Sequence, residues 1–221
     1  MMKNKTLLFK IISIIIDVFI IGSVISCVIN CYTTPNIING NIEKNQSFRY
    51  FTIDSNVLIA VSSLFMVVAT IFKKERNKYL GIFNFVSTCQ ITLTMITVIA
   101  ILVPFNGFHK LYAGRQMLLH LILPLLKLIN CLVFQNYNKH DYKSIIFGYV
   151  PYLIYATIYV IEVLVIGSEN GGWIDIYGFT KNLGTIANSI LMTLLMTGII
   201  LGLYFAIKAI YNKSTSKEEN S

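Results

Sequence analysis

Residues 117–134 read MLLHLILPLLKLINCLVF, an apolar run that is long enough for a bilayer and yet carries ionisable and polar side chains. On a helix, His120, Pro124, Lys127 and Cys131 recur at spacings of four, three and four residues, which places them on one face. Ionisable groups at membrane depth are costly and normally face a protein interior or a water-filled cavity. This stretch therefore predicts a membrane helix with one polar face turned into a bundle.

The composition is that of a membrane protein. The chain has 221 residues, of which 55% are hydrophobic and 13% are charged, whereas soluble domains average about 25% charged residues. The formal net charge of +8 comes mostly from short basic clusters between apolar runs, rather than from a stripe interleaved with aromatic residues. Such clusters are typical of topology signals and contacts with lipid headgroups. Membrane lipids are therefore the expected partners, and nucleic acid is not expected.

Six segments are long enough to cross a hydrocarbon core of about 30 Å, which takes ~20 helical residues. They lie near residues 7–29, 51–72, 80–105, 117–134, 145–167 and 183–207. The connections are short, and no linker or internal repeat divides the chain. We therefore predict an all-α fold, a single integral membrane bundle of six transmembrane helices over residues 1–221.

The distribution of basic residues predicts the orientation of this bundle. They gather at the N-terminus, in the second and fourth loops and at the C-terminus, which favours a cell-membrane protein with both termini in the cytoplasm. The stretch Val24-Ile25-Ser26-Cys27 has the shape of a lipoprotein cleavage site. However, the first apolar run is too long for an ordinary signal peptide and contains Asp17, so we expect an uncleaved first helix.

Several predicted spans carry charged side chains. Asp17 lies near the middle of the first span and Lys127 near the middle of the fourth, and a buried pair would relieve both desolvation costs. Glu162 shares one face of the fifth span with three tyrosines, which are expected to be packing residues. These tyrosines are Tyr152, Tyr155 and Tyr159.

A hydroxyl and an imidazole are expected at similar depth, because the second and fourth helices both start at the outer face. Thr52 and His120 each lie near the start of their helix, and a threonine hydroxyl needs such a base to take its proton. A third group should orient the imidazole, and both Asp54 and Glu162 are candidates for that role. The structural alternatives are that Thr52 caps its helix and that Ser55 and Asn56 are capping or interhelical hydrogen-bonding residues.

Short motifs in a fixed order resemble those of a known membrane protein family. Tyr50-Phe51-Thr52, followed by Ser55 and Asn56, resembles the second-helix motif of the androgen-induced-protein-like family, in its bacterial branch. Leu118-Leu119-His120, followed by Pro124, resembles the His–Pro motif of that branch. The resemblance extends from about Arg49 to the sixth predicted helix.

The last third of the chain carries two further motifs. Pro151-Tyr152 with Tyr155 is similar to the Pro-Leu-x-Tyr segment of the family, and Gly171-Gly172-Trp173 with Phe179 is similar to its aromatic loop. Animal members hydrolyse fatty acid esters of hydroxy fatty acids with a membrane-embedded Thr and His. The resemblance therefore implies a lipid ester hydrolase in which Thr52 and His120 are catalytic.

The chain departs from the family pattern at several places, including a degenerate aromatic loop at residues 174–179 and a slightly different spacing around His120. Asp54 stands where an amide is expected, and Asn130-Cys131 stands where the family has an Asp-Trp pair. The alternative is a non-catalytic membrane protein, either an interaction subunit or a small transporter that uses Asp17, Lys127 and Glu162. A transporter would be expected to show an inverted repeat, and none is recognisable.

No cofactor is expected. The histidines at 109, 120 and 140 lack the spacing of metal ligands, and no motif for an organic cofactor occurs. The sequence does not specify an oligomeric state.

Overall fold

The computed structural model describes residues 2–33, 36–38, 41–43, 47–135, 142–175, 177 and 185–219. Within them, six helices are long and apolar enough to cross a membrane: Leu7–Cys31, Phe51–Ile71, Lys78–Leu102, Arg115–Phe134, Ser144–Ile166 and Ile186–Ile210. The predicted all-α bundle of six spans is confirmed, with boundaries that differ by a few residues. Residues 183–184, the predicted start of the sixth span, lie outside the described residues.

Three of the six spans combine α-helical and π-helical segments. The first three spans are α1 (Met2–Thr33), α2 (Phe51–Ile71) and α3 (Lys78–Thr97) with π-helical η2 (Val98–Leu102). The fourth consists of α6 (Arg115–Met117), π-helical η3 (Leu118–Ile122), α7 (Leu123–Ile129) and π-helical η4 (Asn130–Phe134). The fifth is α8 (Tyr142–Val160) with π-helical η5 (Ile161–Ile166), and the sixth is α9 (Thr185–Glu219).

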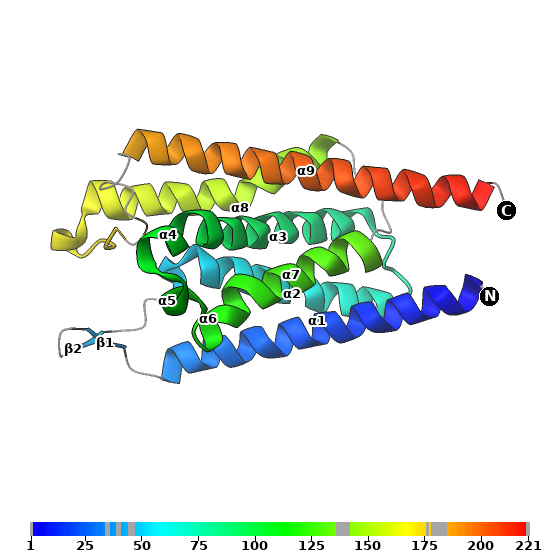
Figure 1. Ribbon diagram of the computed structural model, residues 1–221, viewed down its shortest axis with the longest axis horizontal. Helices are drawn as coiled ribbons and strands as arrows, with labels where there is room; N and C mark the ends of the chain where they lie inside the picture. Colours follow the sequence, from blue (N-terminus) through cyan, green and yellow to red (C-terminus); the bar gives the residue numbers. More distant parts are fainter. Residues whose placement is uncertain are drawn as a thin grey trace.

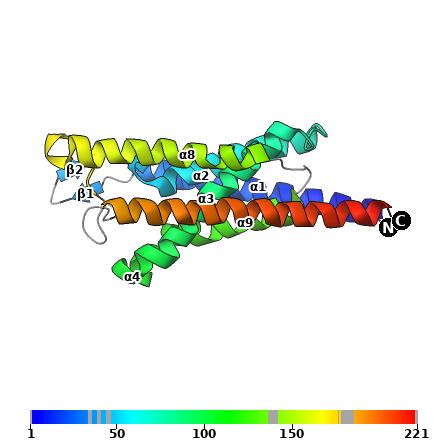
Figure 2. The ribbon, with the colours of Figure 1, turned by 90° about the horizontal axis from the view of Figure 1, so that it is seen from above.

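Short elements connect the spans. They are the antiparallel strands β1 (Asn36–Ile38) and β2 (Asn41–Glu43), the 3-10 turns η1 (Ser47–Arg49) and η6 (Ser168–Asn170), and the helices α4 (Val103–Asn106) and α5 (Phe108–Tyr112). The start of α1 and the end of α9 lie at one end of the bundle, which we call the terminal end (Figures 1 and 2). The strands and α5 lie at the opposite end, which we call the loop end (Figure 1).

The central helix is α3, which runs between α9 and α1 in Figure 1. In an 18-residue apolar window of its span 72% of the residues are buried, against 11–39% in the corresponding windows of the other spans. On one side, Phe85 of α3 packs into a core with Met196 and Ile200 of α9. On the other side, Ile91 of α3 belongs to a second core, which it forms with residues of α1, α2 and α7, namely Ile20, Ile59 and Leu123. The central helix α3 therefore contributes to both cores.

Prolines account for two of the π-helical segments. Pro104 follows η2 and Pro124 follows η3, each within the first two residues of the next α-helix. Proline has no N–H, and its ring crowds the carbonyl four residues earlier, so the preceding turn widens. For Pro124 the crowded residue is His120, which therefore lies in a widened turn.

An ion pair fastens the terminal end, where Lys10 of α1 bonds to Glu75 in the loop between α2 and α3. Burial acts to raise the pKa of Glu75, but the hydrogen bond from Lys10 and the loop backbone outweigh it, so the pKa lies below its ordinary 4.5. We expect Glu75→Gln to reduce stability at neutral pH by about 1 kcal/mol or less. The difference should disappear as the pH falls below 4.5, because a lowered pKa stabilises the fold only while the carboxylate is charged.

Thermal unfolding in detergent at neutral and acid pH measures this effect. Lys74→Gln, an exposed lysine in the same loop, serves as the control. An equal destabilisation by Glu75→Gln at both pH values would contradict the assignment.

Candidate functional site

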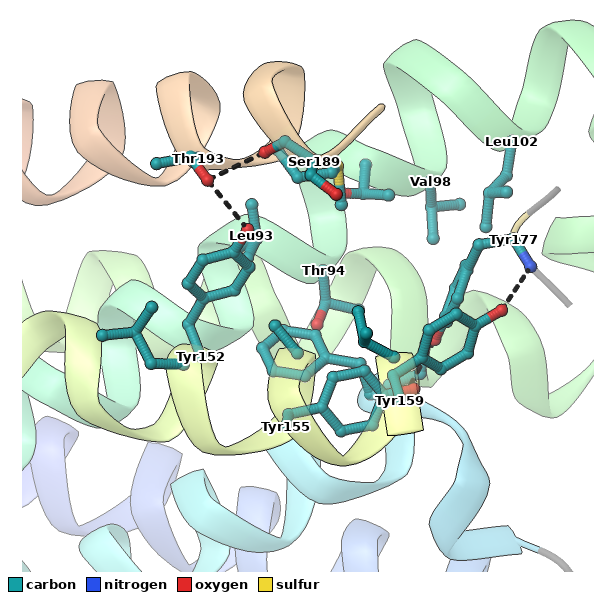
Figure 3. Close-up of a pocket in the computed structure, with 17 residues that line it drawn as sticks. Leu93, Thr94, Val98, Leu102, Tyr152, Tyr155, Tyr159, Tyr177, Ser189 and Thr193 are labelled. Carbon is teal, nitrogen blue, oxygen red and sulfur yellow. Dashed lines mark hydrogen bonds between the residues drawn. The ribbon is translucent and has the colours of Figure 1, made fainter. Parts of the chain in front are cut away.

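A cavity of about 180 Å³ lies toward the loop end, between α2, α3, α8 and α9 (Figure 3). Its wall is mainly apolar, with hydroxyl groups from threonines and tyrosines. The hydroxyl-bearing residues are Thr52, Thr94, Thr97, Tyr152, Tyr155, Tyr159, Tyr177, Ser189 and Thr193. Apolar walls with a few convergent polar groups are typical of small-molecule sites.

The cavity opens toward the lipid-facing surface of the bundle. Leu153 and Val160 of α8 and Thr193 of α9 line it and are also exposed. The volume is smaller than the ~300–1,000 Å³ of most ligand pockets. The cavity alone therefore holds only a small molecule or one part of a larger molecule.

Thr52 lies in the first turn of α2 and lines this cavity. It does not cap the helix, because the N-cap position is Tyr50. Its carbonyl accepts hydrogen bonds from Ser55 and Asn56, whereas its hydroxyl has no hydrogen-bond partner in the described part of the chain. The hydroxyl is therefore available to a molecule in the cavity.

A hydrogen bond between α2 and α3 sets the register beside Thr52. The hydroxyls of Ser55 and Thr94 lie 2.7 Å apart. Because consecutive spans are antiparallel, Thr52 and Thr97, each three residues from this contact, lie toward the loop end at similar depth. Thr97 also lines the cavity, and its buried hydroxyl has no partner among the described residues.

Asn56 connects the two helices that carry the predicted catalytic pair. Its amide nitrogen donates to the carbonyl of Thr52 at 2.7 Å and to the carbonyl of Leu119 at 3.2 Å. One nitrogen thus contacts the backbone of Thr52 and that of the residue before His120. The interhelical role of Asn56 is confirmed, and its bond places Leu119 level with Asn56, one turn along α2 from Thr52.

His120 itself faces a different environment from Thr52. It is buried in η3, its Nδ1 lies 2.8 Å from the carbonyl oxygen of Leu111, and its ring stands edge-on to Tyr112. Because a carbonyl only accepts, Nδ1 carries the proton and Nε2 carries the lone pair. His120 does not line the cavity, and no hydrogen bond joins it to Thr52 in the described residues.

The group that orients His120 is a backbone carbonyl rather than one of the two predicted carboxylates. Asp54 is half-buried, and its carboxylate forms no hydrogen bond or ion pair within the described residues. Glu162 lies in η5, where its carbonyl accepts bonds from the backbone of Gly167 and Trp173. Neither carboxylate bonds to the imidazole in the part of the chain described.

Tyrosine hydroxyls hold the start of α2 in place. Tyr155 donates to the carbonyl of Arg49 at 2.7 Å, and the Phe51 N–H donates to the Tyr177 hydroxyl at 3.0 Å. Burial raises the pKa of Tyr177 to about 12, so this hydroxyl stays protonated at neutral pH. These bonds fix the helix end that carries Thr52.

Tyr159 extends this arrangement into the loop before α9. Its hydroxyl donates to Asp175 at 2.9 Å and accepts from the backbone N–H of Tyr177 at 3.3 Å, as Figure 3 shows in part. The tyrosines of the fifth span were predicted to be packing residues. They do pack, Tyr152 in the core and Tyr155 against Phe51, and all three also line the cavity.

A second polar cluster lies inside the bundle around Lys127. This side chain is 0% exposed, and its Nζ lies 3.9 Å from Oδ1 of Asp17, which is 1% exposed. Nζ also donates to the hydroxyls of Ser62 and Ser63 at 3.1 and 3.3 Å. The other carboxylate oxygen of Asp17 accepts from the amide of Gln135. The predicted Asp17–Lys127 pair is confirmed.

This cluster is separate from the cavity beside Thr52, because neither Asp17 nor Lys127 lines it. Ser62 is also bonded to Asn84 and Ser87 of α3. Polar contacts thus connect α1, through Lys127 of α7 and Ser62 of α2, to the central helix. This arrangement fits a structural cluster that fixes the packing of helices.

The role of some residues of the site could not be predicted from the sequence. Thr94 and Thr97 were visible as polar residues in an apolar span, but their partners were not. Leu111 carried no signal, because every residue offers the same backbone carbonyl. Its position depends on a loop that bends at Gly107 and Gly114, where φ is 83° and 53°.

Comparison with known proteins gives no match to a family model, to a curated protein or to a solved structure. The family resemblance of the motifs around Thr52 and His120 therefore stays a prediction. Within the described residues, no three His, Cys, Asp or Glu side chains gather as a metal site would require.

Proposed function

We propose that this chain is a membrane-embedded hydrolase of lipid esters, in which Thr52 is the nucleophile and His120 is the general base. The observation that carries the proposal is a threonine hydroxyl that has no partner among the described residues and lies on the wall of an apolar cavity that opens toward lipid. A fatty acyl chain would enter sideways from the bilayer, between α8 and α9.

The reaction would proceed in two steps. The Thr52 oxygen attacks the ester carbonyl carbon while Nε2 of His120 takes the hydroxyl proton, and this proton then leaves with the alcohol. Water hydrolyses the acyl-threonine, which releases the fatty acid and restores the hydroxyl. The hydrogen bond from Nδ1 to Leu111 supports this role, because it leaves Nε2 free to accept a proton.

Thr97 is the candidate donor to the developing oxyanion. Its hydroxyl is buried, lacks a partner among the described residues and lines the cavity at the depth of Thr52. A donor that is already in place stabilises the charge without reorganisation.

His120 must reach the Thr52 hydroxyl when the substrate is bound. Catalytic hydrogen bonds often tighten only in the substrate complex, or pass through one water molecule. The amide of Asn56 supports this step, because it joins the two backbones beside these residues.

We further infer a location in the cell membrane with both termini in the cytoplasm. The start of α1, which carries Lys10, and the end of α2, which Lys73 and Lys74 follow, lie at the terminal end, as the positive-inside rule requires of a cytoplasmic side. The cavity would then lie in the outer half of the bilayer, near the ester groups of the lipids.

A cavity-filling variant tests the acyl site. Ala156 is half-buried on the cavity wall, and a phenylalanine there would occupy space that the acyl chain needs. We expect Ala156→Phe to lower kcat/KM for a long-chain fatty acid ester by about tenfold or more, with a smaller loss for an acetyl ester. The measurement is turnover by protein purified into nanodiscs.

Ala187→Phe provides the matched control, because this alanine is exposed on α9 and lies outside the cavity lining. It should leave both rates within about twofold. Equal losses for long and short esters in Ala156→Phe would contradict acyl binding in this cavity.

A non-catalytic lipid-binding protein is the second candidate. The observation in its favour is that no hydrogen bond joins Thr52 to His120 among the described residues. Under this alternative, Ala156→Phe would weaken lipid binding, while purified protein would cleave no ester.

A further inference from the structure

A second groove, of about 410 Å³, lies between the loop-end half of α1 and the start of the fourth span. Its polar residues are Arg115 and three side chains of α1, namely Ser23, Ser26 and Asn30. It shares no residue with the cavity beside Thr52.

Arg115 is the only charged side chain in the described lining of this groove. It is exposed, and it forms no hydrogen bond or ion pair with any residue that the structure describes. A guanidinium presents a planar fork of N–H donors that matches a phosphate in two parallel hydrogen bonds. The groove thus offers, at the loop end of a membrane span, a cation that no described residue pairs with.

The polar residues of α1 form a stripe that runs along the helix from its loop end, near Arg115, toward its middle. Asn30, Ser26 and Ser23 are four and three residues apart, so they share one helix face over about 10 Å. The amide of Asn30 donates to the carbonyl of Ser26 at 2.9 Å, so this interaction uses its nitrogen and not its oxygen. In a groove that faces lipid, these polar groups would lie at the depth of the lipid ester groups, just below the headgroup.

The deeper part of the groove is apolar and open. Phe19 lines it, and a side chain built at Gly22 would meet no atom within 4 Å. From Arg115 inward, the groove therefore offers a cation, hydroxyl and amide groups, and then apolar surface. This order matches the phosphate, the glycerol esters and the acyl chain of a phospholipid.

We propose that this groove binds one glycerophospholipid, with its phosphodiester on Arg115 and its glycerol esters along the α1 stripe. The site is independent of the hydrolase proposal, because the two cavities share no residue. It holds a resident lipid between α1 and the span that carries His120.

The test is a titration of the purified full chain in detergent with phosphatidylglycerol, followed by native mass spectrometry. Arg115→Gln should weaken binding by about tenfold, because a charge-assisted hydrogen bond is lost. Ser26→Leu should also weaken binding by filling the groove. Arg49→Gln, an arginine at the same end but outside the groove, should change affinity by less than about twofold.

Two further ligands separate a lipid site from a site for any anion or any lipid. Diacylglycerol, which lacks the phosphodiester, should bind equally to the wild type and to Arg115→Gln. Glycerol phosphate, which lacks acyl chains, should bind much more weakly than phosphatidylglycerol. Unchanged phosphatidylglycerol affinity in Arg115→Gln or in Ser26→Leu, or equal binding of glycerol phosphate, would overturn the proposal.

Discussion

Thr52→Ala is expected to lower kcat/KM for a long-chain fatty acid ester by a factor on the order of a thousand or more, because the covalent intermediate requires the hydroxyl. The fold should tolerate the change. The Thr52 hydroxyl has no partner within the described residues, and the carbonyl that Ser55 and Asn56 use is retained. Ester turnover by wild type and variant, both with intact unfolding transitions, measures the effect.

Thr193→Ala is the matched control, since it removes a threonine hydroxyl from the α9 wall of the same cavity. That hydroxyl lies 3.4 Å from the hydroxyl of Tyr152, and it is assigned no chemical step. We expect its rate to stay within about threefold of the wild type. If the Thr52→Ala protein kept the wild-type rate, the assignment of Thr52 as the nucleophile would be refuted.

Lys127→Met is expected to reduce the free energy of unfolding by about 3–5 kcal/mol, because it leaves the carboxylate of Asp17 buried without its cation. Both side chains are almost wholly inaccessible, so water cannot replace the lost partner. Unfolding in mixed micelles of increasing denaturing detergent measures the change. Lys208→Met, an exposed lysine on α9, should cost less than about 1 kcal/mol.

Adding Asp17→Asn to Lys127→Met should restore most of the lost stability, because the double variant buries no net charge. The amide of Gln135 could then bond to the new asparagine oxygen, as it now does to the carboxylate. Strictly additive losses in the double variant would contradict a direct interaction between the two charges.

The six spans could be predicted from the sequence because their length and hydropathy are local properties. The Asp17–Lys127 pair was also predictable, since two isolated charges at similar depth are each too costly to stay unpaired. The other partners of this pair could not be predicted from the sequence. Gln135 follows the apolar part of the fourth span, and no pattern indicates that its amide reaches back to α1.

The cavity could not be predicted, although the tyrosine stripe that lines it was visible. The spacing of Tyr152, Tyr155 and Tyr159 indicates a shared helix face. Whether that face packs tightly or leaves a space depends on the combined shapes of side chains from α2, α3, α8 and α9. Those contacts join residues that lie far apart in the sequence.

The surroundings of His120 show the same limit. A charged partner was expected from the residue types that usually orient a catalytic histidine. The structure uses the carbonyl of Leu111 instead, which local sequence cannot distinguish from any other carbonyl. The widened turn at His120 was in principle predictable, because Pro124 follows four residues later.

The most direct test of the proposed chemistry is the site at which a fluorophosphonate probe attaches. The phosphorus of this probe is attacked by an activated hydroxyl, and fluoride leaves. Peptide mapping of labelled wild type in nanodiscs is predicted to find the adduct on Thr52, and folded His120→Ala should lose the label. An adduct on another residue, labelling that persists in Thr52→Ala, or folded wild type that takes no label would contradict the account.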